Sequence, residues 1–127
     1  KPYVVCTGGE PLLQLDEKLI SSLHNIGFEI GIETNGTIKP PAGIDWICVS
    51  PKENADFILK TGNELKLVFP QDKLNPKQYE KLNFDHFFIQ PMDGVNQEQN
   101  IKKSKKFIMK NPKWSLSLQT HKIMGIP

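Results

Sequence analysis

The chain has 127 residues, of which 38% are hydrophobic, and its formal net charge is +2. No apolar run approaches the roughly 20 residues that a membrane-spanning helix needs, and the first residues lack the basic and apolar regions of a secretory signal. The small net charge does not require a nucleic-acid partner. We therefore expect a cytoplasmic globular protein that associates with neither a membrane nor nucleic acid.

The first half of the chain predicts three strands and one long helix. Residues 3–6, 28–32 and 46–49 are short apolar runs of the kind that form buried strands. Between the first two runs, apolar residues recur at spacings of three and four, which predicts one face of a helix. Gly27 follows the last of them, where a helix often ends in a left-handed residue. The apolar face comprises Leu12, Leu15, Leu19, Leu23 and Ile26.

The second half predicts three more strands, over residues 65–69, 87–89 and 114–118, and two helices. Asn75 followed by Pro76 is a favourable start for a short helix over residues 76–82. A longer helix is predicted over residues 97–110. Its lysines are interpreted as a solvated helix face, with an RNA-binding patch as the alternative.

Two cysteines, Cys6 and Cys48, each lie inside an apolar run. Neither belongs to a metal-binding spacing such as CxxxCxxC, so the chain cannot hold an iron–sulfur cluster on its cysteines alone. We expect two reduced thiols in the core.

Short, mostly apolar strands separated by crossovers predict an α/β fold with a parallel sheet covered by helices. Sheets of this kind bind ligands beyond the carboxyl ends of their strands. Polar segments stand at these places in the sequence, so we expect them to meet at one rim. The segments are residues 7–10, 33–35, 50–52, 90–93 and 119–122.

The first polar segment is Gly8-Gly9-Glu10-Pro11. Two glycines allow a ligand to approach the backbone closely, and a carboxylate beside exposed carbonyls suits a cationic amine. The carboxylate argues against a bound phosphate. A plain strand-to-helix turn is the alternative.

The other segments offer hydrogen-bonding groups of several kinds. Glu33 can accept from a ring N–H or an amine, Ser50 and Lys52 supply a hydroxyl and an ammonium, and Gln90 can bind a nucleoside. Each of these segments can equally be an ordinary loop or turn.

Of the three histidines, only His121 follows a predicted strand, which makes it a candidate ligand-binding residue. His24 is predicted to lie on the surface and His86 to be structural.

Taken in order, these motifs resemble the 7-carboxy-7-deazaguanine synthase family of radical S-adenosylmethionine enzymes. The GGEP motif, residues 8–11, resembles the superfamily as a whole. More specific are the segments ETNGT (33–37), VSPK (49–52) and QPMD (90–93), and the ending LQTHKIMGIP (118–127). The resemblance runs from Val4 to Pro127. It implies a partial (βα) barrel in which residues 1–127 are the C-terminal part of a single domain.

The resemblance also implies an activity. Such an enzyme is a lyase that contracts the ring of 6-carboxy-5,6,7,8-tetrahydropterin to 7-carboxy-7-deazaguanine with release of ammonia, in queuosine and deazapurine biosynthesis. It uses S-adenosylmethionine, a 4Fe–4S cluster and Mg²⁺. An electron donor such as a flavodoxin is expected, as is a homodimer.

Site residues follow by resemblance alone. Those expected to bind S-adenosylmethionine are Gly9, Glu10, Ser50, Lys52 and Gln90. Those expected to bind the pterin are Thr7, Gly9, Glu33, His121 and Pro127, the last through its terminal carboxylate.

The chain departs from the family in one respect. The CxxxCxxC motif and the Mg²⁺-binding threonine are expected upstream of Lys1, together with the first strands of the barrel and its cluster loop. The chain alone is therefore expected to be inactive and to hold no metal. Two other interpretations stay open, namely a different small radical enzyme, such as a glycyl-radical activase, and a non-catalytic nucleoside-binding module.

Overall fold

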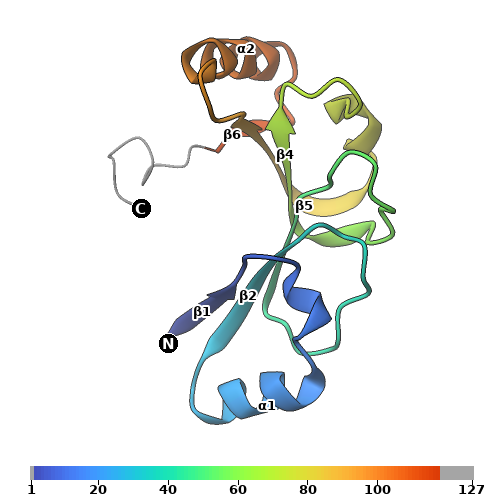
Figure 1. The fold of residues 1–127 in the computed structure, drawn as a ribbon, viewed down its shortest axis with the longest axis vertical. Helices are drawn as coiled ribbons and strands as arrows, with labels where there is room; N and C mark the ends of the chain where they lie inside the picture. The colour runs from blue at the N-terminus through green and yellow to red at the C-terminus, as the bar shows by residue number, and fades with distance from the viewer. Residues whose placement is uncertain (1, 118–127) are drawn as a thin grey trace.

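The computed structural model describes residues 2–117 of the chain. Six strands form one sheet, their order in space is their order in the chain, and every neighbouring pair is parallel. This confirms the predicted α/β fold, and Figure 1 shows the strands as a curved row, consistent with part of a barrel. The strands are β1 (Tyr3–Cys6), β2 (Glu29–Thr34), β3 (Trp46–Val49), β4 (Thr61–Phe69), β5 (Asn83–Pro91) and β6 (Ser115–Leu116).

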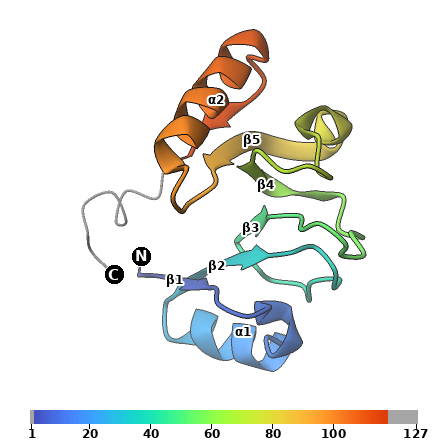
Figure 2. The ribbon, with the colours of Figure 1, turned by 45° about the horizontal axis from the view of Figure 1, so that its top comes forward.

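Two α-helices, α1 (Glu17–Asn25) and α2 (Gln97–Lys110), lie at opposite ends of this row (Figures 1 and 2). Two short 3-10 helices, η1 (Pro11–Leu13) and η2 (Pro76–Tyr79), stand in the connections after β1 and β4. The bounds of α2 are those predicted. None of the helices described between residues 2 and 117 has the length and apolar character to cross a membrane.

The predicted long first helix is wrong in its first half. The chain instead forms η1 and then begins α1 anew at Asp16, whose carboxylate accepts a hydrogen bond from Leu19 N at 2.8 Å. Asp16 is a favourable N-cap, and this cap separates the two helical segments. As a result Leu19 is 45% exposed and Ile20 takes the buried place. Gly27 has the predicted left-handed conformation, with φ of 92°.

The short second helix was also predicted too long. It is a 3-10 turn that ends at Tyr79, although Asn75 caps it as predicted, accepting from Lys77 N at 3.1 Å. β2 runs two residues beyond its predicted end. β4 and β5 are also longer than the apolar runs at residues 65–69 and 87–89 that predicted them. Most of the added positions are polar residues or glycine, which carry no apolar signal. The start of β6 is one residue later than predicted, and its predicted end, Leu118, lies outside the described residues.

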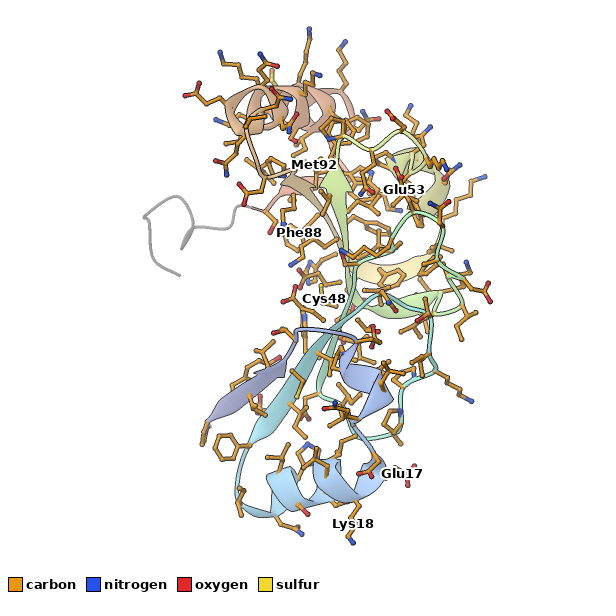
Figure 3. All side chains as sticks on the ribbon, in the orientation of Figure 1. Glu17, Lys18, Cys48, Glu53, Phe88 and Met92 are labelled. Carbon is orange, nitrogen blue, oxygen red and sulfur yellow. The ribbon has the colours of Figure 1, made fainter. Side chains whose placement is uncertain are left out.

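The side chains of the sheet alternate between two environments. Ile30 and Ile32 on β2 and Leu65 and Leu67 on β4 are 0–1% exposed and pack in the core under the helices and loops. Their neighbours along the strands point to the concave face of the sheet, where Figure 3 shows Cys48 and Phe88. Several of those neighbours are polar, so the concave face is chemically distinct from the core. They include Glu33, Glu64, Lys66, His86 and Gln90.

Candidate functional site

A cavity of about 300 Å³ opens at the carboxyl ends of the strands. Every described residue that the sequence proposed for ligand binding lines it. The five strands β1 to β5 each contribute, either through their last residues or through the loop that follows. The lining comprises Thr7, Gly8, Gly9, Glu10, Glu33, Thr34, Asn35, Ser50, Lys52, Lys66, Val68 and Gln90.

The loop after β1 offers bare backbone to this cavity. Gly8 and Gly9 have φ of 69° and 58°, a left-handed conformation that residues with a side chain rarely adopt. A Cβ built on either glycine meets no atom of residues 2–117 within 4 Å. The glycines are therefore needed for the turn, and the space beside them is open to a ligand.

Glu10 ties this loop to the next one. Its Oε2 accepts from Leu12 N at 2.9 Å, and its Oε1 accepts from Asn35 N at 2.8 Å. The hydroxyl of Thr34, which is 2% exposed, donates to both oxygens at 2.9 and 2.8 Å. Glu10 thus lies at the cavity as expected, but its carboxylate already holds the loops after β1 and β2 together. We call this arrangement the Glu10 clamp.

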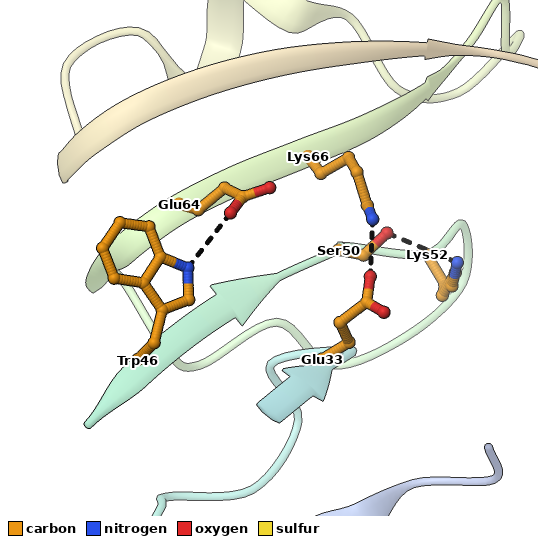
Figure 4. A network of polar contacts seen from close by, with 6 residues as sticks. All are labelled: Glu33, Trp46, Ser50, Lys52, Glu64 and Lys66. Carbon is orange, nitrogen blue, oxygen red and sulfur yellow. Dashed lines mark hydrogen bonds and ion pairs between the residues drawn. The ribbon is translucent and has the colours of Figure 1, made fainter. Parts of the chain in front are cut away.

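Glu33, at the penultimate position of β2, forms an ion pair across the concave face. Its Oε1 accepts from Lys66 Nζ, on β4, at 2.5 Å (Figure 4). Burial alone would lower the pKa of Lys66, but the hydrogen bond to Glu33 and the nearby charges, including Glu64, raise it above its ordinary value. Lys66 therefore stays protonated at neutral pH.

Ser50 and Lys52 follow β3, and Gln90 lies near the end of β5. Ser50 N donates to Thr34 O at 2.8 Å, which continues the ladder between β2 and β3 and fixes the start of the loop. Lys52 Nζ lies 3.5 Å from Ser50 Oγ and is exposed, so it is available to an anionic group. Gln90 pairs in register with Val68 on β4, and both line the cavity.

Asn35 and Gly36, in contrast, form a turn. Asn35 Oδ1 accepts from Thr37 N at 3.0 Å and from Thr37 Oγ1 at 2.7 Å. A Cβ on Gly36 would come within 2.9 Å of Phe57 and Val49. This part of the ETNGT motif is therefore explained by the turn that it builds.

Two lining residues, Lys66 and Val68, lie outside the predicted polar segments, and Thr34 lies inside one of them without having been proposed as a ligand. The signal for Lys66 is the run Glu64-Leu65-Lys66-Leu67, in which charged and leucine residues alternate inside a strand of a parallel sheet. Central strands of such sheets are usually apolar on both faces. Two charged residues on one face therefore indicate a polar interior.

The remaining predicted residues fall in three places. His121 and Pro127 lie outside the described residues. His24 is on the surface as predicted, with Nε2 2.9 Å from Asp45 Oδ2. His86 is exposed on the concave face and stacks on Trp46 with ring centroids 5.8 Å apart.

The cysteines are free thiols, Cys48 buried and Cys6 half-buried. Burial raises the pKa of Cys48 to about 12, and the nearby Glu64 adds to the shift. Within residues 2–117, no group of three or more His, Cys, Asp or Glu side chains is arranged to hold a metal ion. We assign no chemical step to a metal on the described residues.

No family model matches the chain. The chain does match individual proteins that carry the name 7-carboxy-7-deazaguanine synthase. The chain is 53% identical over 124 residues to the protein of Caulobacter vibrioides and 55% identical over 125 residues to that of Bordetella pertussis. These matches cover 98% of this chain but 59% and 60% of the relatives. The protein of Nitratidesulfovibrio vulgaris is 48% identical over 130 residues, covering 100% of this chain and 60% of the relative.

The chain therefore spans about three fifths of the length of the curated relatives it matches. These relatives confirm, over that span, the resemblance that the ordered motifs predict, namely the resemblance to 7-carboxy-7-deazaguanine synthases.

Proposed function

We propose that this chain is part of a 7-carboxy-7-deazaguanine synthase, a radical S-adenosylmethionine lyase. The whole enzyme would convert 6-carboxy-5,6,7,8-tetrahydropterin to 7-carboxy-7-deazaguanine with release of ammonia, in queuosine and deazapurine biosynthesis. The names of the relatives support this proposal, as does the cavity at the ends of the strands. In that enzyme, the chain would be the C-terminal part of one partial-barrel domain.

S-adenosylmethionine, bound to a 4Fe–4S cluster held elsewhere in the enzyme, would supply the radical that begins the reaction. The described residues fit its organic part. Open backbone at Gly8 and Gly9 suits the amino end of its methionine, because no described side chain lies within 4 Å of a Cβ built there. Ser50 and Lys52 would bind its ribose or carboxylate, and Gln90 its adenosine. The Glu10 clamp would hold the glycine loop in the conformation that receives it.

The pterin would lie beside the nucleoside, toward β2. Glu33 would accept hydrogen bonds from the N–H groups of the ring, and Thr7 and Gly9 would contact it from the loop after β1. By resemblance, His121 and Pro127 would complete this side. The protein's task is to orient two ligands side by side and to exclude water, since the radical chemistry belongs to the cofactor. The enzyme would also need Mg²⁺ and an electron donor such as a flavodoxin, and we expect a homodimer.

The observation that carries this proposal is the meeting of Gly9, Glu10, Glu33, Ser50, Lys52 and Gln90 around one cavity. The test uses the full-length protein with its cluster reconstituted, incubated with S-adenosylmethionine, a reductant and the carboxytetrahydropterin. We expect 7-carboxy-7-deazaguanine by mass spectrometry and one equivalent of ammonia. Cleavage of S-adenosylmethionine without this product would indicate another radical enzyme, such as a glycyl-radical activase. Binding without cleavage would indicate a nucleoside-binding module.

A further inference from the structure

Lys66 occupies an unusual position for a lysine. It lies in the middle of β4, and its side chain is 18% exposed on the concave face. Two hollows of that face share it. One is the cavity described above, and the other, also about 300 Å³, lies next to it over Tyr3, Trp46 and Cys48. Glu33 lines both hollows as well, so the ion pair stands between them.

The ion pair holds only one side of the Glu33 carboxylate. Lys66 Nζ is bonded to Oε1, and within residues 2–117 no hydrogen bond reaches Oε2. The side chain of Glu33 is 40% exposed and lines the cavity. Figure 4 shows Lys66 reaching across from β4, with Ser50 and Lys52 beyond the pair.

Two other titratable groups lie near the pair, Glu64 on the same strand as Lys66 and Cys48 on β3. Glu64, two residues before Lys66, is hydrogen-bonded to Trp46. The indole Nε1 of Trp46 donates to Glu64 Oε2 at 3.1 Å. Cys48, on β3, is a neutral thiol at physiological pH because its pKa is raised to about 12 by burial and by Glu64. Lys66 is therefore left with Glu33 as its hydrogen-bonded carboxylate.

We propose that Lys66 is a positioning residue, which holds the Glu33 carboxylate at the cavity so that it accepts from adjacent N–H donors of a pterin ring. A pterin presents two such donors side by side, the ring N3–H and the 2-amino group, and a carboxylate accepts both. This inference rests on the function proposed above. Lys66 itself contacts no part of the ligand in this account.

A suitable measurement is the preference of the full-length protein for 6-carboxypterin over 6-carboxylumazine, which carries a 2-oxo group in place of the 2-amino group. Calorimetry gives both dissociation constants without turnover. We expect the wild-type protein to prefer the pterin, and Lys66→Met to lose about tenfold in pterin affinity but little in lumazine affinity. Lys66→Arg, which retains a cation, should restore most of the preference. Lys77→Met, which changes an exposed lysine of η2, is the matched control and should behave as wild type.

Two outcomes separate this inference from the proposed function. A wild-type protein that binds neither compound overturns the proposed function. A wild-type protein that prefers the pterin, together with a Lys66→Met protein that keeps the same preference, overturns the role of Lys66 alone.

Circular dichroism establishes whether Lys66→Met folds. If it does not, the Glu33→Gln/Lys66→Met double variant, which leaves no unpaired carboxylate at position 33, carries the test. It should match Glu33→Gln in pterin affinity. A further loss would mean that Lys66 binds the ligand directly, and would refute the positioning role.

Discussion

Replacing Glu10 by glutamine tests the Glu10 clamp. The carboxylate receives three donors, namely Leu12 N, Asn35 N and the hydroxyl of Thr34. Glutamine keeps the shape but replaces one oxygen by an NH₂ group. Whichever way the amide turns, its NH₂ faces a backbone N–H, and a charged acceptor becomes a neutral one. Because Thr34 is 2% exposed, water does not readily replace the lost acceptor.

The loss of one hydrogen bond to a charged group costs about 1.5 to 3 kcal/mol. For proteins of roughly 150 to 250 residues, each kcal/mol of lost stability lowers Tm by about 2 to 4 °C, so we expect Tm to decrease by about 3 to 12 °C. Thermal unfolding of the full-length protein, followed by circular dichroism, measures it. Asp56→Asn removes an exposed carboxylate from the loop before β4 and is the control. A Tm for Glu10→Gln within 1 °C of that control would refute the clamp.

Three further changes have expected outcomes. Glu33→Ala should weaken pterin binding by a charge-assisted hydrogen bond, about 1.5 to 3 kcal/mol, and S-adenosylmethionine binding much less; equal losses in titrations of the two ligands would contradict its assignment. Gly9→Ala forces a side chain into a left-handed conformation, with φ of 58° but no steric clash, so unfolding should be easier by about 1 to 2 kcal/mol, measured in urea. Cys48 holds its proton more tightly in the folded protein than in the unfolded chain. Its contribution to the free energy of unfolding is therefore fully present below about pH 9 and is lost as pH rises toward 12, where the unfolded chain releases the proton first. Stability should fall by up to about 1.4 kcal/mol per pH unit in this window, and Cys48→Ala should flatten the profile; an unchanged slope would exclude Cys48 as its source.

Several elements could be predicted from the sequence because local physics defines them. β1 and β3 are apolar runs bounded by turn residues, and the bounds of α2 were predicted without error. The rim was also predictable, since parallel strands bring their carboxyl ends to the same edge.

Other features depend on contacts that no local pattern contains. The first four residues of β4 are polar or glycine, and they form a strand because β5 pairs with them in register from Thr61 onward. The side chain of Asn63 takes the place of a backbone acceptor, because its Oδ1 accepts a hydrogen bond from Ile47 N at 2.8 Å. The Glu10 clamp joins residues 24 and 25 positions apart, and the Glu33–Lys66 pair joins residues 33 apart. Such partners are determined by the tertiary fold.

Within residues 2–117, each strand pairs only with its predecessor and its successor in the chain, so this part of the sheet can grow in the direction of synthesis. No strand has to be inserted between two that are already in place, and each new one joins an open edge. If translation pauses after β3 or β4, the strands already made could pair with the same register that they have in the complete sheet. Among the described residues of the rim, Gln90 would emerge last, so the nucleoside end of the cavity would be the final part to form.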